Sequence, residues 1–145
     1  DKLSIIGSEL LLETLPSIFD GTNDRIKQDE SEVTFAYNIK KEEEKLDFTK
    51  TAKEVHNHIR GLYPFPTSYT TLNGEIIKIC QSHVGEKKSG QCGEIVSIYE
   101  DGLGVMCSDK EVIITRLKPA GKKEMSARDF ANGRGKDKLL GEILC

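Results

Sequence analysis

The sequence has few of the features that mark fibrous, membrane or disulfide-stabilised proteins. Its 145 residues include only four cysteines and four prolines, and no apolar run approaches the roughly 18 to 20 residues of a membrane span. The first residues, Asp1 and Lys2, do not begin the basic and then apolar pattern of a signal peptide. Hydrophobic residues make up 37% and charged residues 31% of the chain, which is typical of globular proteins. We therefore expect a soluble, cytoplasmic protein without membrane association.

The cysteines are too widely spaced for a metal site or a dense disulfide framework. Cys80, Cys92, Cys107 and Cys145 include no C-x-x-C pair. We expect reduced thiols that behave as small buried apolar residues. Because three of them lie in or beside predicted strands, a disulfide between neighbouring strands remains an alternative.

Two stretches near the start of the chain have different patterns. Apolar residues recur near a 3.6-residue period up to Gly21, which predicts an amphipathic helix. Pro16 removes one helical hydrogen bond, so we expect a bend or break near Leu12 to Leu15. Residues 22–47 are rich in charge and turn formers, with a short alternating apolar cluster. This second stretch is typical of an extended linker lying against a neighbour.

A second helix is predicted over the segment TAKEVHNHIRG. Thr51 and Glu54 have the spacing of a capping box, and Gly61 is the expected end of the helix. In the following LYPFP segment, Tyr63 and Phe65 are separated by prolines that hold the backbone extended. These two aromatic rings form either a ledge for stacking or a plug at one end of the sheet domain. We expect them to pack, as aromatic rings at such junctions usually do.

The remaining sequence predicts short strands with a period of two. The dipeptide Asn73-Gly74 between two alternating segments is a strong hairpin signal, because it tolerates the positive φ angles of a type I′ turn. Short strands with tight turns predict a small closed or nearly closed barrel. A short helix that begins after Ser126 and a glycine-punctuated basic tail follow. The five predicted strands are Ser68–Leu72, Glu75–Gln81, Glu94–Tyr99, Leu103–Cys107 and Glu111–Leu117.

No combination of residues predicts an active site. On a helix, His56 and His58 would point about 200° apart and could not hold one ion together. His83 follows a strand with no evident partner. The sequence has no nucleophile elbow, no glycine-rich phosphate loop after a strand and no suitably placed pair of carboxylates. We therefore expect a binding surface.

Positive charge gathers late in the chain. Residues 1–60 contain 9 basic and 13 acidic side chains, whereas residues 61–145 contain 12 and 11. Between Arg116 and Lys138 there are eight basic residues and three acidic ones, a local net charge of +5. Phosphate is the ligand that the lysine-flanked turn after the last predicted strand would attract, unless this is only a solvated surface.

Two blocks of the sequence resemble a known family. The segments LDFTKTAKEVHNHIRGLYPFPTSYTTLNGEIIKI and RLKPAGKKEMSARDFANG are similar to the C-terminal domain of methionyl-tRNA formyltransferases. The leading LLLETLPSIFDGT and the segment QDESEVTFAYNIKKEEEKLDF also look like that family. The resemblance divides the chain into residues 1–21, the last helix of a formyltransferase domain, residues 22–44, a linker, and residues 45–145, the C-terminal domain.

The resemblance implies a mostly β fold with flanking helices, built on an open, OB-like β-barrel that binds and orients tRNA in translation initiation. It implies a monomeric parent enzyme that transfers a formyl group from 10-formyltetrahydrofolate to initiator methionyl-tRNA. The family's catalytic Asn, His and Asp belong to a preceding N-terminal catalytic domain and have no match here. We therefore expect this chain alone to be inactive, with no catalytic, cofactor or metal site. The implied phosphate-binding candidates are Lys118, Lys122, Lys123, Arg128, Arg134 and Lys136, with Arg116 and Lys138 as secondary candidates.

Two other functions remain open at this point. The barrel would instead belong to a related formyltransferase, or to a formyltetrahydrofolate hydrolase or dehydrogenase, that acts on small molecules, and its basic patch would then be incidental. Alternatively, it would be a scaffold or dimerisation domain.

Overall fold

The computed structural model describes residues 2–86 and 89–145, and it contains two units, one up to Tyr37 and one from Asn38 to Cys145. The first unit contains helix α1 (Lys2–Phe19) and the short 3-10 helix η1 (Glu30–Glu32). The predicted break near Leu12 to Leu15 is wrong, because α1 runs through Pro16 without interruption. The proline lies in the last turn, and the Asp20 N–H donates to the Pro16 carbonyl at 2.9 Å. The helical hydrogen-bond ladder therefore resumes directly after it.

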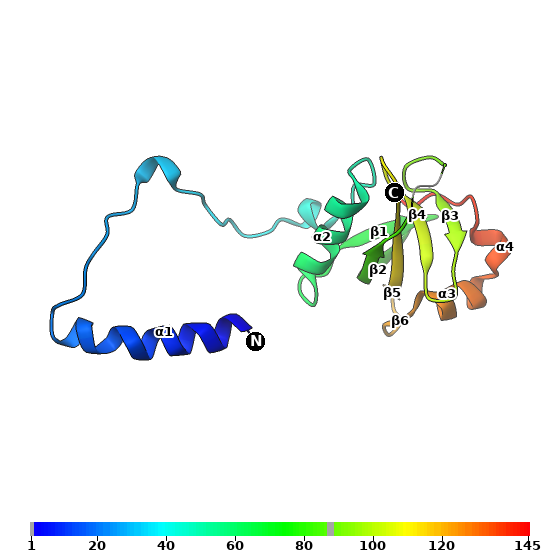
Figure 1. Ribbon diagram of the computed structural model, residues 1–145. Coiled ribbons are helices and arrows are strands. Elements are labelled where there is room, and N and C mark those ends of the chain that lie inside the picture. The colour runs from blue at the N-terminus through cyan, green and yellow to red at the C-terminus, as the bar shows by residue number, and fades with distance from the viewer. Residues whose placement is uncertain (1, 87–88) are drawn as a thin grey trace. The chain divides into compact units, whose positions relative to one another are not determined.

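The second unit is built on one curled antiparallel sheet (Figure 1). The strands follow the order β1-β2-β5-β4-β3, and β6 pairs with the far end of β5. This arrangement confirms the predicted mostly β unit with an open barrel and flanking helices. All five predicted strands are present, whereas β6 was not predicted. The strands are β1 (Tyr69–Leu72), β2 (Glu75–Val84), β3 (Ile95–Ile98), β4 (Leu103–Met106), β5 (Glu111–Pro119) and β6 (Met125–Ser126).

The β1–β2 hairpin turns at Asn73 and Gly74, as predicted. Their φ angles are 51° and 82°, the positive values that a type I′ turn requires. The turn fixes the register of the hairpin, in which Leu72 lies opposite Glu75 and Tyr69 opposite Lys78. Side chains alternate between the two faces of the sheet. Ile77 and Ile79 are therefore buried in the barrel, while Lys78 lies on the outer face.

Helices cover the two ends of the sheet unit. Helix α2 (Ala52–Leu62) packs against β2 and β5, and α3 (Ala127–Arg134) packs against β5, followed by the short α4 (Lys136–Leu139). The predicted capping box is confirmed, because Thr51 Oγ1 accepts from the Glu54 N–H and the Glu54 carboxylate accepts from the Thr51 N–H. The predicted end at Gly61 is wrong by one residue, because the buried Leu62 completes the packed face of the helix. Ser126 caps α3 as predicted.

All four cysteines are free thiols. Cys80 and Cys107 are buried, as expected, whereas Cys92 is half-buried and Cys145 is exposed. Burial is the main cause that raises the pKa of Cys80 to about 11 and that of Cys107 to about 12. These two thiols therefore stay protonated and unreactive at neutral pH. Of the helices in the described ranges, none has both the length and the apolar character that crossing a membrane requires.

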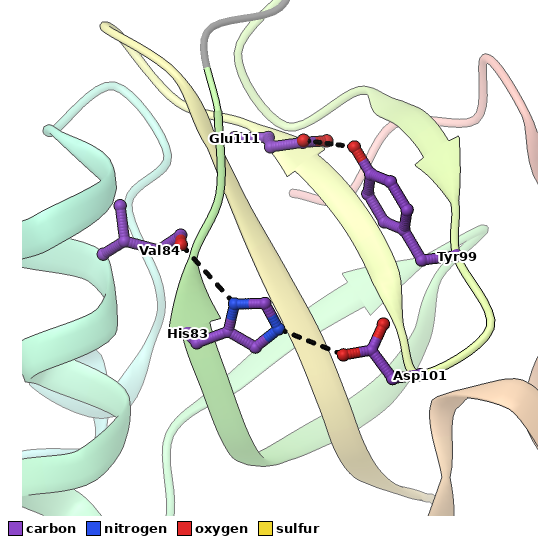
Figure 2. Close-up of polar contacts among 5 residues, drawn as sticks. All are labelled: His83, Val84, Tyr99, Asp101 and Glu111. Atoms are coloured by element: carbon purple, nitrogen blue, oxygen red, sulfur yellow. Dashed lines mark hydrogen bonds and ion pairs between the residues drawn. The ribbon is translucent and has the colours of Figure 1, made fainter.

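A buried carboxylate ties β5 to the β3–β4 hairpin (Figure 2). Glu111, at the start of β5, is fully buried, and its Oε1 accepts a hydrogen bond of 2.5 Å from the Tyr99 hydroxyl. Its Oε2 has no hydrogen-bond partner in the part of the chain that the structure describes. This oxygen lies directly against Gly104, where an added Cβ would be only 2.1 Å away. Glycine at position 104 therefore leaves room for the carboxylate, which any side chain there would displace.

Replacing Tyr99 with Phe should destabilise the protein, because it removes the hydrogen bond to a carboxylate that water does not reach. We expect Tyr99→Phe to lower the free energy of unfolding by about 1–3 kcal/mol. Tyr69→Phe is the matched control. Tyr69 is half-buried like Tyr99, but its hydroxyl makes no hydrogen bond among the described residues, so its change should stay within about 0.5 kcal/mol. Urea unfolding followed by circular dichroism measures both, and equal stability of the two variants would contradict this role of Tyr99.

Candidate functional site

The turn between β5 and β6 presents the first group of predicted basic residues. Strand β5 ends at Pro119, the chain reverses at Gly121 with a φ of 71°, and β6 returns to pair Met125 with Leu117. Lys122 and Lys123 lie in this turn and are exposed. The hairpin therefore holds two neighbouring ammonium groups in solvent beside the end of β5.

Lys78 of β2, which the sequence did not single out, lies beside this hairpin. The register places it directly opposite the predicted Lys118, which is exposed on β5. Like charges in directly opposed positions of an antiparallel pair repel each other, so an anion that binds between them would relieve that repulsion. The Lys78 ammonium also donates to the Pro66 carbonyl at 3.0 Å. We call these four residues the lysine band: Lys78, Lys118, Lys122 and Lys123.

Among the residues that the structure describes, the lysine band has no acidic partners. The described residues contain four ion pairs, and each of them uses an arginine or a histidine as its basic member. No lysine in residues 2–86 or 89–145 lies within ion-pair distance of a carboxylate. The charges of the lysine band are therefore available to an external anion.

The three predicted arginines, in contrast, each face a carboxylate. Arg116 Nε lies 2.5 Å from Glu124 Oε1, and Arg128 Nη1 lies 3.1 Å from Glu100 Oε1. The hydrogen bond and charge of Glu124 raise the pKa of Arg116 above its ordinary value. Arg134 pairs with Glu75 in the same way. Exposed ion pairs of this kind contribute only about 0–1 kcal/mol, so a phosphate can replace the carboxylate at little cost.

A groove of about 750 Å³ lies between the β1–β2 turn, the β5–β6 turn and helix α3. Lys122 lines one part of it and Arg134 another, and the guanidinium carbon of Arg134 lies 5.1 Å from the centre of the Phe130 ring. Ile76 and Met125 provide apolar lining. The carboxylates of Glu75 and Asp129 also line the groove, so it combines two cations and two carboxylates with apolar surface. A phosphate that binds there would compete with Glu75 for Arg134.

A second groove, of about 620 Å³, shares the Glu75–Arg134 pair with the first. Lys138 of α4 lines this second groove, while Lys136 is exposed on α4 and lines neither. Arg128 also lines neither groove and instead contacts Glu100, which follows β3. The structure therefore brings Lys122, Arg134 and Lys138 together around the two grooves, but not Arg128 or Lys136.

The histidines do not form a reactive cluster. The expectation that His83 has no partner is wrong, because its Nε2 lies 3.3 Å from Asp101 Oδ2, a residue of the β3–β4 turn (Figure 2). His56 Nδ1 lies 3.0 Å from Ser82 Oγ, and burial, with Arg60 and His83, lowers the pKa of His56. Within the described ranges, no group of three His, Cys, Asp or Glu residues could hold a metal ion.

Solved structures with a similar fold include those of HypX from Aquifex aeolicus. A variant of that protein gives a TM-score of 0.69 at 17% sequence identity, with 88% of this chain and 23% of HypX covered. HypX in complex with tetrahydrofolic acid gives a TM-score of 0.65 at 18% identity, with 88% and 22% covered. At this identity the likeness concerns the fold alone.

Sequence relatives are much more similar. Methionyl-tRNA formyltransferases of Bacillus thuringiensis (strain Al Hakam) and Bacillus cereus (strain AH820) are each 51% identical over 138 residues, which is 92% of this chain. The match covers 43% of each relative, so the chain spans less than half of their length. The family model described as "Formyl transferase, C-terminal domain" matches residues 38–135, well over half of the chain. The chain therefore belongs to the formyl transferase C-terminal domain family.

Proposed function

We propose that this chain is the tRNA-orienting part of a methionyl-tRNA formyltransferase, and that its lysine band and the groove beside it hold the tRNA backbone. The observation that carries the proposal is the grouping of four lysines on two paired strands and the turn that follows, where none has an acidic partner in the described part of the chain. The name of the 51% identical relatives supports the choice of substrate. The full enzyme then acts in the cytoplasm as a monomer.

The reaction of the parent enzyme needs positioning of a large substrate. The methionine amino nitrogen on initiator tRNA forms a bond to the formyl carbon of 10-formyltetrahydrofolate, the bond from that carbon to N10 breaks, and the proton lost by the amine ends on N10 as tetrahydrofolate leaves. We assign none of these bond changes to this chain. Its residues hold the RNA so that the amino group stays near the folate, which the preceding domain binds.

Electrostatics favour a backbone ligand over a small one. Duplex RNA and DNA present closely spaced phosphates, and each phosphate neutralised by a lysine releases condensed counterions. Residues 1–37 contain 3 basic and 8 acidic side chains, which leaves 18 basic and 16 acidic ones in residues 38–145. The second unit is therefore only weakly positive, and the affinity must come from local groups of free lysines.

The lysine turn should carry a large share of the salt-dependent affinity. We expect Lys122→Glu with Lys123→Glu to weaken binding of an initiator tRNA transcript by roughly 10- to 50-fold at 0.1 M salt, and to make the slope of log affinity against log salt shallower by about 2. Filter binding across a KCl series measures both quantities.

The matched control is Lys40→Glu with Lys41→Glu, which makes the same charge change at two adjacent exposed lysines of the same unit. That control should lose much less affinity and keep the wild-type slope. If both double variants lost affinity equally, net charge rather than the lysine band would explain binding.

Substitutions of the two members of the Glu75–Arg134 pair should change tRNA affinity in opposite directions. Arg134→Gln should weaken tRNA binding by several-fold, because it removes a cation from both grooves. Glu75→Gln should strengthen it, because it removes a carboxylate that competes for Arg134 and repels phosphate. Glu42→Gln, on the 3-10 helix η2 (Lys41–Glu44), removes the same charge elsewhere in the unit and serves as the control. Weaker binding by the Glu75 variant would exclude the grooves from the interface.

The small-molecule alternative is tested with the full-length parent enzyme. A parent that formylates free amines or releases formate from 10-formyltetrahydrofolate, and does not act on methionyl-tRNA, would overturn the proposal. The scaffold alternative predicts a dimer in size-exclusion chromatography, with no change when tRNA is added.

A further inference from the structure

An aromatic side chain projects from the loop between α2 and β1. Phe65 is 88% exposed, and Tyr63 is 39% exposed. The expectation that both rings pack at the end of the barrel is therefore wrong for Phe65. The physical reason is the short span of the loop. Thr67 returns at once to the end of α2, where its N–H donates to the Leu62 carbonyl at 2.8 Å, so the loop turns outward with Phe65 at its tip.

The loop is constrained on both sides of Phe65. The Thr67 hydroxyl donates to the Pro64 carbonyl at 2.6 Å, and the Pro66 carbonyl accepts from the Lys78 ammonium at 3.0 Å. Pro64 and Pro66 each fix their own φ angle. A ring presented by a loop that is already ordered loses little backbone entropy when it binds a partner.

The surroundings of the loop are basic. Lys78, which holds Pro66, belongs to the lysine band and lies opposite Lys118 on β5. The cores of protein–protein interfaces are depleted in lysine. In contrast, sites for single-stranded nucleic acid combine cations along the backbone with an aromatic ring on which a base stacks. The neighbours of Phe65 therefore favour an RNA partner over a protein surface.

We infer that Phe65 stacks on an unpaired nucleobase of the RNA whose phosphates bind the lysine band. The inference rests on the proposed function, because it needs the band to hold RNA. It adds a stacking site for a single-stranded part of the ligand. Base-paired nucleotides are already stacked on both sides and cannot occupy it without opening the helix.

The absence of tryptophan from the chain provides a direct test. In Phe65→Trp, the only indole reports on this position, and stacking of a base should quench its fluorescence when an initiator tRNA transcript is added. A blunt RNA duplex in which every base is paired should leave the fluorescence largely unchanged at the same bound fraction. Ile39→Trp, at a 50% exposed position of the same unit, is the control and should respond to neither RNA.

Affinity provides a second, independent readout. Phe65→Ala should weaken tRNA binding about 5- to 100-fold while leaving the salt slope unchanged, because stacking releases no counterions. Phe65→Trp should bind as tightly as the wild type, and both variants should bind the blunt duplex normally. Because Phe65 is exposed, neither substitution should affect folding.

The outcomes separate this inference from the proposed function. Salt-dependent tRNA binding with no quenching in Phe65→Trp and no loss in Phe65→Ala would overturn the stacking site and leave the lysine band in place, with Phe65 then facing a protein surface. If the wild-type chain did not bind tRNA in a salt-dependent manner, both the proposed function and the stacking site would be overturned. Quenching by tRNA alone, with the loss in Phe65→Ala, supports the inference.

Discussion

The pairing of β2 with β5 is the constraint on which the rest of the second unit depends. In this pairing, Ile77 lies opposite Pro119, Lys78 opposite Lys118, and Ile79 opposite Leu117. A shift of one residue in either strand would turn its isoleucines or leucine toward solvent and its lysine into the core. Burial of the apolar side chains therefore fixes the register, and the same register forces two lysines together on the outer face. The proposed RNA-binding surface is therefore a direct consequence of core packing.

The basic residues of the candidate site fall into two groups, arginines that pair with a carboxylate and lysines that do not. Arg116, Arg128 and Arg134 are held by carboxylates and take defined positions, as Arg134 does between Glu75 and the ring of Phe130. The lysines have flexible side chains and no acidic partners within the described ranges, so they can follow a phosphate backbone of variable geometry. An excess of basic over acidic residues in the sequence did not distinguish these groups. Their distinction depends on which carboxylates the fold brings near.

Two local signals were read correctly from the sequence, although the break expected next to Pro16 was wrong, and contacts between distant segments were not predicted. The Asn73-Gly74 turn and the capping box at Thr51 depend on residues within four positions, and the structure confirms both. Lys78 was missed because its importance comes from Lys118, forty residues later. The pairing of Arg134 with Glu75 and the exposure of Phe65 also depend on contacts between distant segments. The sequence therefore predicted that the candidate residues are basic and lie late in the chain. Which of them lie close together could be seen only from the fold.

Phosphates alone cannot set the position of an RNA on this surface. The backbone repeats the same charge at every nucleotide, so a row of lysines binds equally well after a shift of one step along it. An aromatic ring that stacks only on an unpaired base favours one of these shifted positions over the others, because unpaired bases occur at few places in a folded RNA. Phe65 directly precedes Pro66, whose carbonyl accepts from Lys78 of the lysine band. In the proposed complex, the stacked base and the bound phosphates would together define both register and direction. An enzyme that must bring one amino group to one formyl carbon needs both.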